Sequence, residues 1–139
     1  MSELTASELQ QEFEKNFAPW VQELDLAVAE AGDGRVTVVM RPGEQLVRAG
    51  GIVSGQALMA AADTAMVLAV FAACGAPVLC ATVDMSTSFL KPATRVDLHI
   101  SAEVTRLGRQ MAFARAEITS SADDKLVVTA SGTYAMPPR

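Results

Sequence analysis

The first apolar pattern along the chain has the spacing of a helix. In residues 3–24, Phe13 and Phe17 are four positions apart within a mostly polar segment. This spacing predicts an amphipathic N-terminal helix whose apolar side packs on the rest of the protein. We place its N-cap at Ser7, and we expect Pro19 to bend or end it.

A pair of strands is predicted next. Residues 35–43, "RVTVVMRPG", are rich in β-branched side chains and end at a Pro-Gly turn. The preceding stretch, residues 24–34, ends in "GDG", which favours a tight hairpin turn between the two strands. Residues 44–54 then read as a glycine-containing loop.

Residues 55–74 form the longest apolar segment, and "CGAP" ends it. Within positions 57–73, Asp63 and Thr64 are the two polar side chains. A membrane span needs about 20 apolar residues. The apolar run at 57–73 is shorter, has a central aspartate and is rich in alanine, so we predict a buried core helix.

After Cys74 the pattern changes to period two, which is typical of strands with one buried face. In residues 94–104, apolar side chains alternate with polar ones, and His99 falls on the polar side. The connections between the strand-like segments are short, and this predicts antiparallel pairing of consecutive strands. The four segments are residues 81–93, 94–104, 110–120 and 125–136.

This order of elements predicts an α+β fold. A helix that is apolar on nearly every side must be covered on nearly every side, and its alanines allow close approach. We therefore expect the hotdog arrangement, in which a curved antiparallel sheet of five to six strands wraps the helix and a second subunit covers the rest. The length of 139 residues predicts one domain, 1–139, with residues 1–24 as an N-terminal helical segment.

Composition and charge limit the classes of molecule that the protein is expected to bind. Half of the residues are apolar and 19% are charged, as in a folded globule. The net charge is −5 and the eleven basic residues are scattered, so we expect neither a nucleic-acid nor a membrane partner. Two cysteines and one histidine make no metal-site spacing, and the N-terminus has no secretory pattern. We expect a cytoplasmic protein with no metal.

Asp63 is a charged residue in the middle of an apolar segment, and this placement needs an explanation. A carboxylate in apolar surroundings is unfavourable unless it is hydrogen-bonded, paired or protonated. Its presence in the middle of the predicted core helix indicates either a satisfied structural role or chemistry.

Several short motifs carry a family resemblance. They are "GG" at 50–51, "SG" at 54–55, "ADTAM" in the helix, and "TVDMSTSFLKPA" after it. Together, at this separation, they resemble the PaaI-like branch of hotdog-fold acyl-CoA thioesterases over residues 35–134. The family usually has an asparagine, a glycine and then His-Gly-Gly before the helix. Here Arg48 stands at the asparagine position, Ser54 at the histidine position, and Gln56 at the second glycine, as in a sub-branch of the form R-x-G-G-x-V-S-G.

The resemblance implies that Asp63 acts on the thioester, either as the nucleophile or as the general base for water. Helix physics adds an oxyanion donor, because the N–H of Gly55 at the helix start has no intrahelical partner. Eight residues separate the two along one helix, or about 12 Å. One subunit therefore cannot bring both to one carbonyl carbon, and we predict a site shared across a homodimer or homotetramer.

Other residues receive roles by position. Thr82 matches a hydroxyl position of the family and is a candidate to orient water or Asp63, and Ser54 is a candidate to contact the carbonyl or to cap the helix. Arg48 has three candidate roles: binding an acidic acyl group, holding coenzyme A phosphates, or pairing with Asp63. Coenzyme A would be part of the substrate, and no cofactor is expected. The predicted substrate-binding residues are Arg48, Gly51, Thr64, Ser88, Lys91 and Arg106, with Arg95 and Arg109 as further phosphate candidates.

Three other functions fit parts of the pattern. A hotdog dehydratase or hydratase would need Asp and His together, and His99 is poorly placed for that. A non-catalytic acyl-CoA-binding or sensing protein would follow if Arg48 and Ser54 have removed activity. A purely structural dimer would leave Asp63 unexplained. The acyl group is not specified by the sequence.

Overall fold

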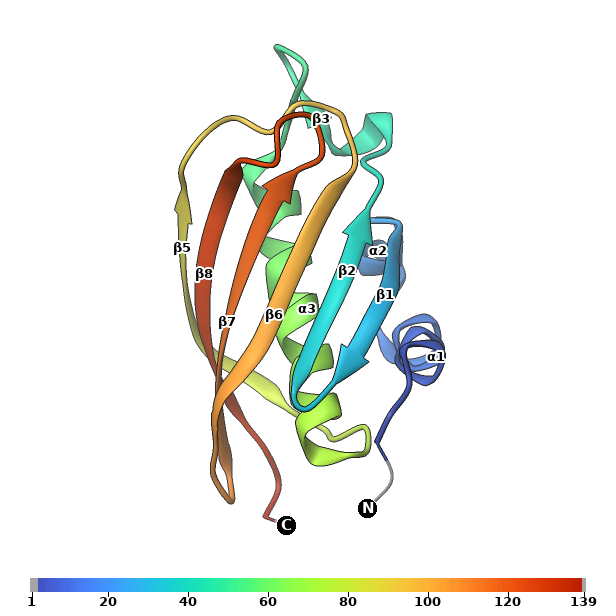
Figure 1. The fold of residues 1–139 in the computed structure, drawn as a ribbon, viewed down its shortest axis with the longest axis vertical. Coiled ribbons are helices and arrows are strands. Elements are labelled where there is room, and N and C mark those ends of the chain that lie inside the picture. Colours follow the sequence, from blue (N-terminus) through green and yellow to red (C-terminus); the bar gives the residue numbers. More distant parts are fainter. Residues whose placement is uncertain (1–2, 139) are drawn as a thin grey trace.

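The computed structural model describes residues 3–138, and Figure 1 shows a strongly curved sheet wrapped around one long helix. All sheet pairs are antiparallel, in the order β1-β2-β6-β7-β8-β5. This confirms the predicted α+β hotdog fold. The helices are α1 (Ala6–Asn16), α2 (Pro19–Gln22) and α3 (Gly55–Cys74), and the sheet strands are β1 (Leu26–Gly32), β2 (Arg35–Met40), β5 (Ala81–Phe89), β6 (Leu98–Leu107), β7 (Met111–Ser120) and β8 (Leu126–Ala135).

The central helix α3 begins and ends where the sequence predicts. The Ser54 side chain accepts a hydrogen bond from the Ala57 N–H at 3.2 Å and caps the first turn. Gly75 ends the helix in the left-handed conformation, with φ 72°, which glycine adopts without steric strain. Both signals are local, and the bounds of the helix could therefore be predicted from the sequence.

Small side chains let the sheet approach α3 closely. Ala61, Ala62, Ala65 and Ala69 are fully buried in the core. By length and hydropathy α3 resembles a membrane span, but most of it is buried inside the protein. It is the core helix of the fold, as predicted.

The N-terminal helix differs from the prediction. Thr5, and not Ser7, is the N-cap of α1, because Thr5 and Glu8 form a reciprocal capping box. The helix ends at Asn16, and a separate short helix, α2, starts with Pro19 at its first position.

Two turns rest on positive φ angles. The predicted "GDG" hairpin turn joins β1 and β2 through Asp33 and Gly34, with φ 50° and 70°, as a type I′ turn requires. The predicted loop at 44–54 instead contains a 3₁₀ turn (Glu44–Leu46) and a small hairpin, β3 (Val47–Arg48) and β4 (Ile52–Val53). Gly50 and Gly51 form the tip of that hairpin, with φ 96° and 77°.

The predicted pairing of consecutive strands is wrong for β5 and β6. β5 pairs with β8 at the far edge of the sheet, and the chain then crosses the end of the sheet to reach β6. The connection, residues 90–97, can span about 26 Å when extended. Three inter-strand steps of about 4.8 Å are well within that reach, so the short connection did not require a hairpin.

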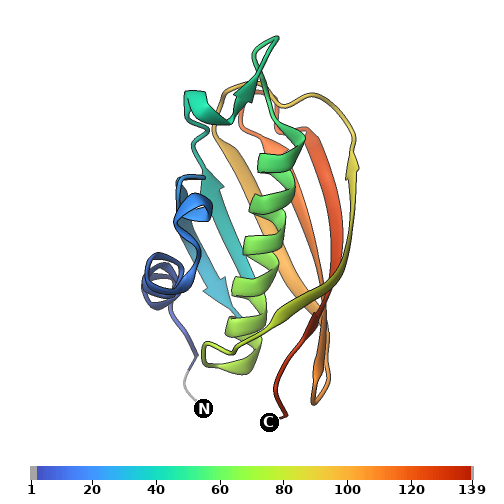
Figure 2. The ribbon, with the colours of Figure 1, turned by 180° about the vertical axis from the view of Figure 1, so that it is seen from behind.

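This crossover leaves β5 as an edge strand. The opposite edge, β1, is covered by α1, whereas β5 runs along the open side of α3 (Figure 2). Val83 and Phe89 on β5 are about half exposed, and so is Leu90, which follows it. An uncovered edge strand with exposed apolar side chains favours pairing with another chain.

Candidate active site

Asp63 lies in the middle of α3, on the helix face that the sheet does not cover. Its side chain is half-buried, whereas Thr64 and the two alanines before Asp63 are buried. The less buried positions recur at helical spacing, which defines one open stripe along the helix. That stripe consists of Gln56, Met59, Ala60, Asp63 and Val67.

Two hydroxyl groups hold the carboxylate. The Tyr134 hydroxyl donates to Asp63 Oδ1 at 2.8 Å. The Thr82 hydroxyl donates to the same oxygen at 3.1 Å and lies 3.5 Å from Oδ2. The two donors to Asp63 differ in solvent exposure. Tyr134 is fully buried, whereas Thr82 is exposed to solvent.

Strand register brings the two donors together. Thr82 on β5 is the direct partner of Tyr134 on β8, next to a bulge between Thr82 and Asp84. Gly132 makes room for the tyrosine, because a Cβ at that position would lie 2.8 Å from the Tyr134 oxygen. A larger residue at position 132 would push the phenol away from Asp63.

The groups around Asp63 stay neutral at pH 7. Burial, and then the negative charge of Asp63, raise the pKa of Tyr134 well above its ordinary value. Burial, followed by the charge of Asp63 and then by Cys74, raises the pKa of Cys80 to about 11. A thiol with that pKa is a poor nucleophile, since the thiolate is the reactive form. Cys80 therefore lines the site and is not its reactive group.

Tyr134 is the site residue that the sequence analysis missed. The available signal was a tyrosine at an inward position of the last strand, because a buried phenol needs a hydrogen-bond partner. Its partner lies 71 positions away in the chain, so the pairing itself could not be read from the sequence.

We expect Tyr134→Phe to lower kcat about tenfold, with a smaller change in KM, because the carboxylate loses the donor that fixes its orientation. Loss of a hydrogen bond to a charged acceptor should also reduce stability by about 1.5–3 kcal/mol. Steady-state kinetics and urea unfolding measure the two effects. Thr129→Val, which removes a hydroxyl from the other face of β8, is the matched control. An unchanged kcat in a folded Tyr134→Phe protein would show that this hydrogen bond does not serve catalysis.

The start of α3 presents a free donor. Gly55 is the first residue of the helix, and within residues 3–138 its N–H makes no hydrogen bond. Such an N–H lies at the positive end of the helix dipole and suits a developing oxyanion. Gly55 and Asp63 lie on the same helix about 12 Å apart, as expected.

The structure does not bring every predicted residue to Asp63. The Thr64 hydroxyl is buried and donates to the Ala60 carbonyl at 2.8 Å, so it faces away from the carboxylate. Arg48 is exposed and donates to the Ala49 carbonyl at 2.9 Å, and it forms no ion pair with any described residue. Gly51 lies at the exposed tip of the β3–β4 hairpin, and Ser88 near the end of β5 is exposed.

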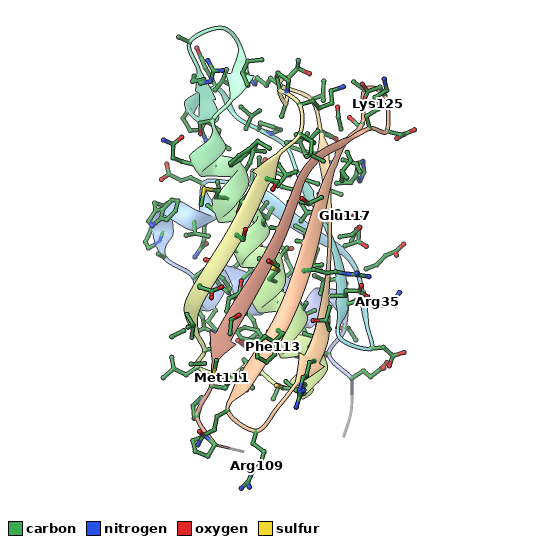
Figure 3. The ribbon with its side chains drawn as sticks, turned by 90° about the vertical axis from the view of Figure 1, so that its left-hand side faces the viewer. Arg35, Arg109, Met111, Phe113, Glu117 and Lys125 are labelled. Carbon is green, nitrogen blue, oxygen red and sulfur yellow. The ribbon has the colours of Figure 1, made fainter. Side chains whose placement is uncertain are left out.

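The predicted phosphate-binding cations divide between the two ends of the sheet. Lys91 pairs with Asp123 in the β7–β8 turn at 2.6 Å, close to Lys125 at the top of Figure 3. Arg106 lies near the opposite end, beside the β6–β7 turn where Figure 3 labels Arg109. One subunit therefore cannot use Lys91 and Arg106 on the same phosphate group. Arg95 donates to the Pro42 carbonyl at 2.9 Å.

The described residues place no three His, Cys, Asp or Glu side chains where they could hold a metal ion. His99 is exposed on the face of the sheet that points away from α3. Around Asp63 the described residues provide a carboxylate and two hydroxyl donors, and the N-terminus of α3 lies about 12 Å away along the helix.

The family follows from a sequence comparison. The model of the thioesterase superfamily matches residues 50–127, more than half of the chain. The chain therefore belongs to the thioesterase superfamily. A search of curated proteins gives no significant match.

Solved structures share the fold over nearly the whole chain. Zebrafish thioesterase superfamily member 2 is 27% identical, with a TM-score of 0.84, covering 96% of this chain and 99% of its own. The E. coli PaaI protein from the phenylacetic acid degradation operon is 20% identical, with a TM-score of 0.82, covering 95% and 93%. A hypothetical thioesterase from Streptococcus pneumoniae, solved with coenzyme A, is 19% identical, with a TM-score of 0.81, covering 94% and 98%. The predicted resemblance to PaaI-like hotdog thioesterases is confirmed.

Proposed function

We propose that this protein hydrolyses an acyl-CoA thioester to a free acid and coenzyme A, with Asp63 as the reacting carboxylate. The observation that carries the proposal is the placement of Asp63: it lies on the open face of the core helix of a thioesterase-superfamily fold, held by Tyr134 and Thr82. Coenzyme A in the similar S. pneumoniae protein supports a coenzyme A ester as the substrate.

Two routes use this carboxylate. As a general base, Asp63 takes a proton from water, the hydroxide oxygen attacks the carbonyl carbon, and the coenzyme A thiolate leaves and is protonated. As a nucleophile, Asp63 attacks directly and forms a mixed anhydride that water then hydrolyses. In both routes negative charge develops on the carbonyl oxygen, and this charge needs a preorganised donor.

The donor we propose is the N–H of Gly55 of the partner subunit. Strand β5 runs antiparallel to α3 in the same chain (Figure 2). Its first residues lie beside Asp63, since Thr82 donates to that carboxylate. Its last residue lies beside Gly55, since a Cβ on Gly55 would be 3.5 Å from the Phe89 ring. The first residues of β5 thus lie beside Asp63, and its last residue lies beside Gly55 of the same chain.

A two-fold axis through the middle of β5 would bring opposite ends of the two strands together. If the exposed edge of β5 pairs antiparallel with its copy, the Phe89 end of one subunit lies beside the Thr82 end of the other. Asp63 then faces Gly55 of the partner subunit, which overcomes the separation of about 12 Å within one helix. The pairing also covers the half-exposed apolar side chains of this edge. We propose a homodimer on this basis, or a homotetramer made from two such dimers.

The proposed dimer also assigns positions in the active site to some of the predicted residues. Ser88 would lie across the interface from the partner's Thr82, and Arg48, at the Gly55 end, would be available for the phosphates of coenzyme A. Arg48 suits this role better than pairing with Asp63, because its guanidinium is exposed and forms no ion pair within residues 3–138. Ser54 caps α3, which leaves the backbone N–H of Gly55 as the carbonyl donor.

The test is thiol release from a panel of acyl-CoAs, followed with a thiol-reactive dye. We expect steady-state turnover of at least one ester, and the panel identifies the acyl class. Tight acyl-CoA binding by a folded, dimeric protein that turns over none of them would contradict the proposal and indicate a binding protein. A hotdog dehydratase is disfavoured, because exposed His99 and the Asp63 site lie on opposite sides of the sheet.

A further inference from the structure

An apolar pocket opens one helical turn from Asp63. It has a volume of about 480 Å³ and lies between the α1–α2 junction, α3 and the segment that leads into β5. Residues of all three elements line it, and no Asp, Glu, Lys, Arg or His side chain does. The lining includes Phe17, Val67, Phe71, Val78, Leu79 and Cys80.

The pocket lies next to Asp63, although the carboxylate is not among its lining residues. Val67 is four residues after Asp63, so both lie on the same stripe of α3, about 6 Å apart along its axis. Cys80 lies two residues before Thr82, the donor to Asp63, and is close enough to Asp63 for the carboxylate charge to affect its thiol. A group attached to a carbonyl at Asp63 would therefore lie within reach of the pocket.

The side chains that line the pocket are uncharged and, apart from Asn16, mostly apolar. The rings of Phe17 and Phe71 are in contact, with centroids 6.4 Å apart, and Phe17 also contacts Phe13 at 5.4 Å. The Cys80 thiol stays protonated at neutral pH. Burying an ionic group among these side chains would be strongly unfavourable, so the pocket favours an uncharged, apolar occupant.

One side of the pocket is exposed to solvent in the single chain. Leu79 is 87% exposed, the most exposed large apolar side chain of the described residues. An apolar group lying in the pocket would remove part of that side chain from water. The volume falls within the usual range of small-molecule sites, about 300–1,000 Å³.

The geometry points to this pocket as the acyl-binding site, and to substrates with an extended apolar acyl group, a medium-length alkyl or an aryl chain, in preference to acetyl or dicarboxylic esters. The inference rests on the proposed function, since it places the carbonyl at Asp63. It assigns specificity to Val67, to Leu79 and to the α1–α2 junction at Ala18, none of which takes part in the chemistry.

Two variants fill the pocket from opposite sides. Val67→Phe adds bulk from α3, and Ala18→Trp adds it from the exposed α1–α2 junction, where the fold is least disturbed. Ala27→Trp on β1, exposed and outside the pocket, is the matched control. The substrates are saturated acyl-CoAs from acetyl to dodecanoyl, with phenylacetyl-CoA and succinyl-CoA.

For the wild type we expect kcat/KM to rise by up to about fourfold for each methylene that enters the pocket. Val67→Phe and Ala18→Trp should lower kcat/KM for octanoyl-CoA at least about tenfold and change acetyl-CoA less than about threefold, the difference expected when acyl-chain burial alone is lost. Ala27→Trp should match the wild type. A wild type that hydrolyses acetyl-CoA and octanoyl-CoA equally well would overturn the inference, and so would variants that slow all esters equally.

A binding measurement separates this inference from the proposed function. Titration calorimetry with the non-hydrolysable S-octyl thioether of coenzyme A, compared with S-methyl coenzyme A, needs no turnover. We expect the octyl compound to bind at least about tenfold more tightly to the wild type, and this preference to disappear in both pocket variants. If no ester is hydrolysed but this preference holds, the proposed hydrolysis fails and the pocket stands. If esters are hydrolysed and the preference is absent, the pocket assignment fails alone.

Discussion

Replacement of Asp63 by asparagine should lower kcat/KM for the best acyl-CoA at least about a hundredfold, or about 3 kcal/mol of barrier. Asparagine has nearly the same shape, and its amide oxygen can still accept from Tyr134 and Thr82. It can neither take a proton from water nor form a mixed anhydride. The loss should therefore appear in kcat, with the fold and the oligomeric state retained.

The measurement is steady-state thiol release, with circular dichroism and light scattering to verify fold and assembly. Asp124→Asn is the matched control. Asp124 is exposed in the β7–β8 turn at φ 58°, a conformation that asparagine tolerates. An Asp63→Asn protein that keeps most of its activity while Asp124→Asn behaves as wild type would exclude Asp63 as the reacting group.

The second large effect is expected at Gly55, where proline should lower kcat about a hundredfold or more. Removing one oxyanion donor typically costs a factor of about 10²–10³ in kcat. Proline has no N–H, yet it is favoured at the first position of a helix. The preceding residue, Ser54, has φ −63° and ψ 145°, an extended conformation compatible with a following proline. The variant should therefore lose the donor with little harm to the helix.

Gly55→Ala is the control for the side chain alone. Its Cβ would meet the Phe89 ring at 3.5 Å, an ordinary contact, and the N–H would remain. We expect Gly55→Ala to keep activity within about fivefold of wild type, since the donor is unchanged. Equal losses in the alanine and proline variants would mean that space at this position matters and the N–H does not.

The fold could be predicted because its signals are local. The segment that forms α3 is apolar on nearly every side, Ser54 and Gly75 mark its ends, and period-two alternation marks the strands. The N-cap of α1 was also within reach, since Thr5 and Glu8 have capping-box spacing, and placing the cap at Ser7 overlooked that pair.

The relations between distant segments could not be predicted. The alternation in residues 81–93 indicates a strand but does not specify which strand pairs with it. In the structure β5 pairs with β8 at the edge of the sheet. For the same reason Asp63 could be singled out as a buried-looking carboxylate, while its donor Tyr134 could not. The direction of the Thr64 side chain could not be predicted from its place beside Asp63 either, because consecutive residues of a helix point in different directions, and its hydroxyl donates to the Ala60 carbonyl.

The shared active site that we propose combines Asp63 of one subunit with Gly55 of the other. Mixing the inactive Asp63→Asn and Gly55→Pro chains by refolding or coexpression tests it directly. Each mixed dimer would contain one intact site, so a random mixture should recover about a quarter of wild-type thiol release, the fraction expected when half of the dimers are mixed. Mixed dimers that are demonstrated by mass spectrometry but show no more activity than either parent would contradict the shared site.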